Sequence, residues 1–114
     1  MVSPDQLRIL AMAYDQVETS PHFERESFRI RKKIFATLDA KNQEVTVKLT
    51  PIDQSVFCAF DKAVIYPVEG TWGKQGWTKV NLRKIRKSML QDLLTTAYCT
   101  VAPSKLAQQY MSGE

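Results

Sequence analysis

The sequence predicts an α+β domain in which one antiparallel sheet packs against helices, in the order helix, three strands, helix, two strands, helix. Two helix starts are marked by a capping residue followed by proline, and the stretches between the helices alternate apolar and polar side chains. The connections between the strands are short, which suits antiparallel neighbours but not parallel ones. The chain has 114 residues, the length of one domain, and we expect residues 1–114 to form it.

The first helix is predicted over residues 4–18. Ser3 can cap it, Pro4 suits its first position, and Gln6 completes a capping box. Apolar residues recur at helical spacing along the segment, so one face should pack against the rest of the domain. We expect the helix to stop near Pro21.

Three short strands are predicted next, near residues 28–31, 34–38 and 45–49. In the first of them Phe28 and Ile30 alternate with basic side chains, so the apolar residues should face the core and the basic ones should face away. The short connections make a three-stranded antiparallel meander the simplest arrangement.

A second helix is predicted over residues 51–60, because Thr50 can cap it and Pro51 suits its first position. Apolar residues recur along it at helical spacing. Its buried stripe is expected to consist of Ile52, Val56, Ala59 and Phe60.

A second hairpin is predicted from residues 63–66 and 77–82, which are rich in β-forming residues. Pro67 limits the first of these strands to a sheet edge or a strand end. Three glycines within residues 69–76 indicate a loop between the two strands.

The last helix is predicted over residues 89–101. Ser88 and Gln91 form a capping box at its start, and Pro103 closes it. A short frayed turn is expected after the proline.

Composition and charge place the chain among globular proteins. It is 44% hydrophobic and 25% charged, and its longest uncharged run, from Leu93 to Ser104, is far shorter than the ~20 apolar residues of a membrane span. Asp5 and Arg8 interrupt the N-terminus before an apolar leader could form. We therefore expect a cytoplasmic protein with no membrane span.

The two cysteines, Cys58 and Cys99, each fall in a predicted helix with apolar neighbours. We expect both to be free, buried thiols, because a free cysteine behaves as a small hydrophobic residue. The single histidine and the absence of a C-x-x-C pair leave none of the usual zinc-ligand spacings. Neither a metal nor another cofactor is expected.

Eleven of the 16 basic residues fall in two short windows, residues 25–33 and 74–87, and the stretch from Gly70 to Gln91 carries +6 with no acidic residue. A positive field of this kind attracts the phosphate backbone of nucleic acids. An ordinary solvated surface is the alternative interpretation. The residues predicted to contact phosphates are Arg29, Arg31, Lys32, Lys33, Lys74, Lys79, Arg83, Lys84, Arg86 and Lys87.

Trp72 and Trp77 flank the glycine-rich loop. Exposed tryptophans among lysines can stack on bases or insert into a groove. The competing interpretation is structural, because a tryptophan at the base of a hairpin commonly packs against a neighbouring helix.

No arrangement of residues indicates an enzyme. The segment from Gly70 to Gln75 lacks the glycine spacing and the Ser/Thr of a phosphate loop. His22 has no recognisable nucleophile or orienting carboxylate, so a solvated surface histidine is favoured over a general base. Asp53 and Asp92 each fall in the first turn of a predicted helix, where a carboxylate complements the helix dipole.

The order of elements, together with several segments, resembles the MmcQ/YjbR-like family across nearly the whole chain. The segments are Phe28-Arg29-Ile30, Lys33-Ile34-Phe35-Ala36-Thr37-Leu38, Val47-Lys48-Leu49, Gly76-Trp77-Thr78-Lys79-Val80-Asn81-Leu82 and Leu93-Leu94-Thr95-Thr96-Ala97-Tyr98.

The resemblance implies a small bacterial protein with an α-β(3)-α-β(2)-α fold of the secretion-chaperone-like class. It also implies DNA binding through a "double wing" of hairpins, in a family whose biological role is largely undefined. Lys32 stands where this family favours a glycine in the first hairpin turn, so that turn must strain a non-glycine residue or adopt another geometry.

Two functions therefore compete. The first is a DNA-binding domain that holds backbone phosphates on the two basic windows with little sequence preference. The alternative is a protein-interaction module of chaperone-like fold with no nucleic-acid role. DNA binding requires both windows to lie on one face, whereas a partner-binding module should expose an apolar patch of several hundred Å².

Overall fold

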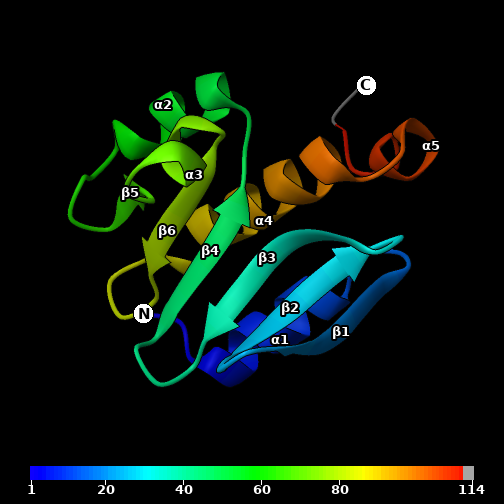
Figure 1. Cartoon of the computed structure of the whole chain (residues 1–114), viewed down its shortest axis with the longest axis horizontal. Helices are drawn as coiled ribbons and strands as arrows, with labels where there is room; N and C mark the ends of the chain where they lie inside the picture. The colour runs from blue at the N-terminus through cyan, green and yellow to red at the C-terminus, as the bar shows by residue number, and fades with distance from the viewer. Residues whose placement is uncertain (112–114) are drawn as a thin grey trace.

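The computed structural model describes residues 1–111, so the last three residues of the predicted domain lie outside the described residues (Figure 1). The helices in this part of the chain are α1 (Pro4–Met12), α2 (Pro51–Cys58), α3 (Thr71–Lys74), α4 (Lys87–Val101) and α5 (Ser104–Ala107). The strands are β1 (Val17–His22), β2 (Arg25–Ile30), β3 (Lys33–Asp39), β4 (Glu44–Lys48), β5 (Ile65–Pro67) and β6 (Trp77–Asn81).

All six strands belong to one sheet with the order β1-β2-β3-β4-β6-β5. Every pair of neighbouring strands is antiparallel. Strands β2, β3 and β4 form the predicted meander, and β5 pairs with β6 as the predicted second hairpin. The predicted fold class, an α+β domain with one antiparallel sheet, is confirmed.

Strand β1 occupies a segment in which the sequence predicts helix and loop. Helix α1 has the predicted cap, with Ser3 and Gln6 in a capping box, but it ends at Met12 and not at residue 18. Gln16 then has a φ of 63°, which interrupts any right-handed helix, and β1 pairs with β2 along its whole length. Pro21, which has no N–H to donate, is tolerated because β1 is an edge strand.

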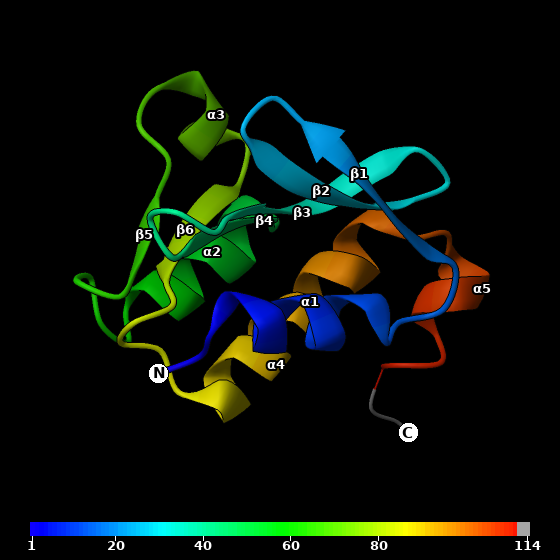
Figure 2. The same ribbon diagram turned by 90° about the horizontal axis from the view of Figure 1, so that it is seen from below.

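The helices cover one face of the sheet. Figure 2 shows α1, α2, α4 and α5 on one side of the strands, whereas α3 lies at the margin of the opposite side. Helix α4 crosses the middle of the sheet and buries Leu90, Leu93, Leu94, Ala97 and Tyr98. The strand side chains in the same core include Phe28, Ile30, Phe35, Leu38, Val45, Val47 and Val80, each with at most 1% of its surface exposed.

Three local predictions need correction. Helix α4 begins at Lys87 with Arg86 at its N-cap and no capping hydrogen bond from a side chain, so the predicted capping box of Ser88 and Gln91 is absent. The predicted loop over residues 69–76 contains the short helix α3, which the sequence analysis missed. The expected turn after Pro103 is the short helix α5.

The predicted buried stripe of α2 is also wrong, because Ile52, Val56 and Phe60 are 76%, 55% and 65% exposed. The cause is the side chain of Gln54. Its amide Nε2, which carries two hydrogens, donates among three nearby acceptors: the Gly73 carbonyl at 2.9 Å, and the Trp77 carbonyl and the Thr78 hydroxyl, each at 3.1 Å.

These contacts orient the helix face that carries Gln54 towards the sheet. Phe57, which follows three positions later on the same helix face, is packed against the core with Cys58. The opposite face of the helix, including Ala59, is therefore left exposed.

The β2–β3 turn places two basic residues at positive φ. Arg31 has a φ of 50° and Lys32 one of 72°. Positive φ at both central residues is the geometry of a two-residue type I′ hairpin turn, which matches the twist of the flanking strands. The turn therefore strains two non-glycine residues and carries Arg31, Lys32 and Lys33 at one tip.

Candidate nucleic-acid interface

The floor of the candidate site is the sheet face that faces away from the core. Ser27 lies opposite Thr37, Thr37 opposite Thr46, and Thr46 opposite Lys79, so the four side chains form one row across four strands. The three hydroxyl residues are 0%, 9% and 8% exposed, which means that larger neighbours rise around them. The row is therefore the bottom of a depression that ends at Lys79.

Helix α3 forms the wall at one end of this depression and carries Trp72 over it. Gly73 makes this possible, because a Cβ at that position would lie 1.8 Å from the Val68 carbonyl oxygen. The backbone of α3 thus sits directly on the chain that follows β5. Trp72 remains 62% exposed, and its ring lies edge-on to Trp77, with centroids 6.4 Å apart and planes at 69°.

The β1–β2 turn forms the opposite end. His22 ends β1 and Arg25 begins β2, so the two side chains share a strand pair and a face. Between them Phe23 has a φ of 59° and is 94% exposed, and its ring centroid lies 5.0 Å from that of His22. His22 therefore lies at the end of a strand and is half-buried, whereas the sequence favoured a solvated surface histidine.

We call the hollow between these walls the sheet-face pocket. Its volume is about 460 Å³, within the range of pockets that hold small ligands. No aspartate or glutamate is among the described residues that line it. The lining residues are His22, Arg25, Ile34, Thr37, Thr46, Val68, Trp72, Trp77 and Lys79.

The cations that line the pocket form no salt bridge within the part of the chain that the structure describes. Within residues 1–111 the ion pairs are those of Arg8, with Asp5 at 2.5 Å and Glu26 at 2.6 Å. Arg25 and Lys79 make no salt bridge there, although the charge of Arg25 helps to lower the pKa of the nearby Asp39 carboxyl. A pocket lined by one sign of charge focuses its field and concentrates ligands of the opposite sign.

Two further cations border the pocket along the same face. Lys48 lies opposite Trp77, with its Nζ 5.5 Å from the centre of the indole ring and hydrogen-bonded to the Gln75 carbonyl. Arg29, two residues after Ser27 on β2, donates from Nε to the Ser27 hydroxyl at 3.0 Å. The face therefore presents cations on β2, β4 and β6.

The structure brings together four of the residues predicted from the sequence. Trp72, Trp77 and Lys79 line the sheet-face pocket, and Arg29 borders it. Lys74 lies on α3, two residues after Trp72. Both tryptophans face the open side of the sheet, and Trp77 packs against a neighbouring helix through Trp72 of α3 and also contacts Lys48.

The remaining basic residues lie at two opposite ends of the sheet. Arg31, Lys32 and Lys33 sit beyond the Lys48 and Trp77 pair, at the end where β6 begins. By contrast Arg83, Lys84, Arg86 and Lys87 follow the point where β6 ends. The outer parts of the two basic windows therefore lie at opposite ends of the sheet, whereas Arg25 of one window and Lys79 of the other meet at the pocket.

Sequence reasoning missed three residues of this region as site residues: His22, Arg25 and Lys48. The signal for Lys48 was present, because the alternation of residues 45–48 puts Thr46 and Lys48 on the face opposite Val45 and Val47. His22 and Arg25 depended on β1, whose strand character the sequence analysis did not detect.

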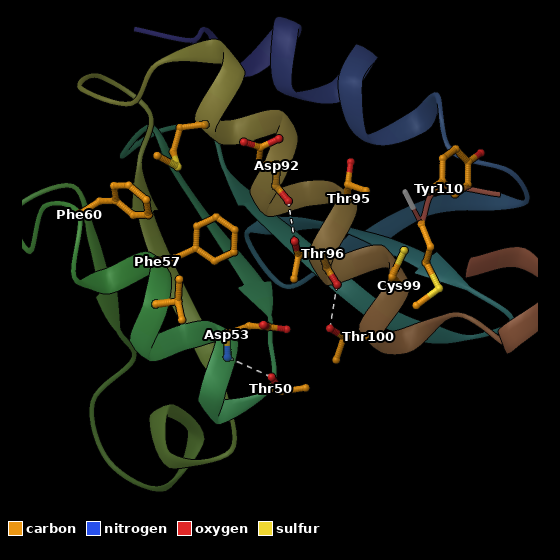
Figure 3. Close-up of a pocket in the computed structure, with 13 residues that line it drawn as sticks. Thr50, Asp53, Phe57, Phe60, Asp92, Thr95, Thr96, Cys99, Thr100 and Tyr110 are labelled. Atoms are coloured by element: carbon orange, nitrogen blue, oxygen red, sulfur yellow. Dashed lines mark hydrogen bonds between the residues drawn. The ribbon is translucent and has the colours of Figure 1, made fainter. Parts of the chain in front are cut away.

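A second hollow lies on the other side of the sheet, between α2 and α4 (Figure 3). We call it the helix-side groove, and its volume is about 840 Å³. Figure 3 shows Asp53 and Phe57 projecting from α2 towards the α4 residues Thr96 and Thr100. Asp92 of α4 also lines the groove, and no lysine or arginine occurs among its described lining residues.

Other site types find no support in residues 1–111. No group of three or more His, Cys, Asp or Glu side chains in this range is placed to hold a metal ion. None of the helices described for these residues combines the length and the apolar character needed to cross a membrane.

Comparisons with known proteins agree with this fold. The family model described as YjbR matches residues 12–100. None of the curated proteins is a match. The crystal structure of the Deinococcus radiodurans protein DR2400, which contains a DUF419 domain, superimposes with a TM-score of 0.79 at 18% identity, over 96% of this chain and 88% of that chain. The family model spans well over half of the sequence, and the chain belongs to the YjbR family.

Proposed function

We propose that this protein binds nucleic acid on the open face of its sheet, with backbone phosphates held by Arg25, Arg29, Lys48 and Lys79. The observation that carries the proposal is the sheet-face pocket, which joins two tryptophans to Arg25 and Lys79, cations without a salt bridge, and has no carboxylate among its described lining residues. Arginine and lysine contacts to phosphates position a nucleic acid but do not read its sequence. The expected binding is therefore weakly specific and strongly dependent on salt.

The proposed phosphate-binding residues differ from those that the two basic windows alone indicate. Lys79 lies at the end of the hydroxyl row, and Arg25 lies at the opposite end of the pocket, so an extended phosphate chain can reach both. Arg83, Lys84, Arg86 and Lys87 lie beyond the end of β6 and outside the pocket lining. They serve as the internal comparison for the test.

The test compares two double variants of equal charge. Arg25→Glu with Lys79→Glu should weaken binding of nucleic acid on the order of 100-fold at ~50 mM salt, whereas Lys84→Glu with Lys87→Glu should weaken it only a few-fold. In fluorescence titrations at several salt concentrations, the first variant should also lose about two units from the slope of log K against log salt. Equal losses of affinity in the two variants would show that only net charge matters, and would refute phosphate binding at the sheet-face pocket.

A second candidate function, protein interaction, is favoured by the exposed apolar face of α2. Ile52, Val56 and Phe60 are each more than half exposed at i, i+4 and i+8, beside a groove whose charged lining residues are Asp53 and Asp92. The occupant that fits is an amphipathic helix of another protein, with lysines flanking its apolar stripe.

A basic amphipathic model peptide should bind to this groove at least tenfold more tightly than its glutamate counterpart. The double change Val56→Asp with Phe60→Asp should abolish the binding. Failure of both peptides to bind, or dimerisation of the protein through the same residues in sedimentation, would overturn this candidate.

A further inference from the structure

We infer that the sheet-face pocket selects single-stranded nucleic acid, with an unstacked base placed against Trp72. This inference rests on the proposed function and narrows its ligand. Three features of the site point to this ligand: the exposure of its aromatic rings, its concave shape and the position of its cations.

The aromatic rings around the pocket are unusually exposed. Trp72 shows 62% of its surface and Phe23, at the other end, shows 94%. Trp77 meets Trp72 at an interplanar angle of 69°, so the two rings are not stacked, and 62% of Trp72 remains exposed. An exposed indole face among cations is the type of surface on which a nucleobase stacks.

Stacking of this kind requires a base whose own face is free. In a duplex the faces of the bases are covered by their neighbours, and a protein meets only groove edges, sugars and phosphates. Single strands can turn their bases outwards and stack them on aromatic side chains. The exposed ring of Trp72 can therefore stack on a base of a single strand, but it cannot stack on a base inside an undistorted duplex.

The shape of the site points to the same ligand. The hollow of about 460 Å³ lies between two walls, the β1–β2 turn with His22 and Arg25 and the α3 wall with Trp72, and its floor is the low hydroxyl row. Phe23 lines an adjoining hollow together with His22, Glu24 and Arg25. A convex duplex resting on these walls is held away from the floor. A single strand can enter and lie between them.

The cations are placed to follow the backbone of such a strand. Arg25 stands at the Phe23 end and Lys79 near the Trp72 end, both within the pocket lining, and Lys48 lies over the Trp77 ring. Aromatic rings alternating with cations along a groove bind a single strand with little dependence on sequence. The same chemistry accepts DNA or RNA, and the probes below distinguish them.

The experiment follows tryptophan fluorescence during titration of the whole protein at ~50 and ~200 mM salt. The probes are oligo(dT) and oligo(U) of about twelve nucleotides and a mixed-sequence duplex of equal length. At least one single strand should bind at least tenfold more tightly than the duplex. The comparison of oligo(dT) with oligo(U) shows whether the pocket prefers DNA or RNA.

Two variants of matched exposure locate the effect. Trp72→Ala should weaken single-strand binding roughly 5- to 150-fold, the range that base stacking on an aromatic side chain supplies, and should leave duplex binding unchanged. Phe60→Ala, which removes an aromatic ring of similar exposure on the helix side, should change neither. Because both positions are exposed, both variants should retain the folded state. Circular dichroism checks this.

The outcomes separate the two proposals. Duplex binding that equals single-strand binding, or single-strand binding that Trp72→Ala does not weaken, overturns this inference and leaves nucleic-acid binding in place. Absence of binding to all three probes at ~50 mM salt overturns both.

Discussion

The sheet-face pocket and the helix-side groove are two hollows on opposite sides of one sheet, and their chemistry is opposite. The pocket is lined by Arg25 and Lys79 with no carboxylate, and the groove by Asp53 and Asp92 with no lysine or arginine among its described lining residues. A net charge of +4 conceals this separation. The molecule therefore offers an anion-binding surface and a surface for apolar, basic partners, and these surfaces need not compete.

The two hollows are also built differently. The floor of the pocket consists of strand residues fixed by register, and its α3 wall is held by backbone contacts that tolerate no side chain at Gly73. The groove lies between two helices, and the rotation of α2 depends on the hydrogen bonds of one side chain, that of Gln54. Substitutions should accordingly disrupt the pocket mainly by straining the backbone, and the groove mainly by removing side-chain packing.

The largest effect is expected at the backbone beside the sheet-face pocket. Gly76→Ala should lower the free energy of unfolding by ~4 kcal/mol, because Gly76 has a φ of 105° and a Cβ there would lie 1.7 Å from the Leu49 carbonyl oxygen. Gly70→Ala is the matched control, since Gly70 also has positive φ but has no atom within 4 Å of an added Cβ. It should cost about 2 kcal/mol, because the φ of 79° and the ψ of −152° at Gly70 lie in a region that glycine alone adopts readily. Urea denaturation measures both, and equal losses would contradict the close approach.

A smaller effect is expected from the helix-side groove, where two phenylalanines on and just after α2 face different environments. Phe57→Ala should cost about 2 kcal/mol of unfolding free energy, because Phe57 packs against the core. Phe60→Ala should change it by less than about 0.5 kcal/mol, since that ring is 65% exposed. Thermal unfolding of the two variants checks the rotation of the helix. A greater loss for Phe60 would show that the stripe predicted from the sequence is the buried one.

These two faces of α2 show where sequence reasoning about the fold succeeds and where it fails. The caps at Ser3 and Thr50 were predictable because they involve residues three positions apart, and both are present. The rotation of α2 was not, because it is set by the bonds of Gln54 to Gly73, Trp77 and Thr78, about twenty residues away. A stripe of apolar residues alone does not reveal such a long-range polar contact.

Strand β1 shows the same limit, with a direct consequence for the site. Its segment contains Pro21 and few apolar residues, so local propensity disfavours a strand. Pairing with β2 overrides that propensity, and it brings His22 and Arg25 to the pocket. Trp72, Trp77 and Lys79 were predictable as candidates from charge and aromatic content. Their convergence, and the separation of Arg83 to Lys87 from them, required the topology.

A still smaller effect concerns the ion pair outside both hollows, between Arg8 of α1 and Glu26 of β2. Arg8 Nε lies 2.9 Å from Glu26 Oε1, and this hydrogen-bonded guanidinium holds the pKa of Glu26 below its usual value. A carboxyl group whose pKa is lower in the folded than in the unfolded state stabilises the protein at pH values above the unfolded pKa. This contribution is lost as the pH falls through the folded pKa. Glu26→Gln should cost about 0.5 to 1 kcal/mol at pH 7, reduced by solvent screening of a half-exposed pair.

The wild-type protein and the Glu26→Gln variant should therefore converge in stability in acid. Denaturation curves at a series of pH values measure this. A difference that persists unchanged below the folded pKa of Glu26 would assign the effect to packing and not to charge. Because Glu26 lines neither hollow, binding at the sheet-face pocket should not change in the same variant.

The smallest expected effect is on thiol reactivity, and it compares a cysteine inside the helix-side groove with one outside its lining. Both cysteines are free and half-buried, and Cys99 lines the groove whereas Cys58 does not. Burial raises the pKa of each thiol, which lowers the fraction of reactive thiolate at neutral pH. Both should therefore react with a thiol reagent more slowly in the native protein than in denaturant. Cys58→Ser and Cys99→Ser resolve the two rates, and a native rate equal to the denatured one at either position would show that its side chain is not shielded.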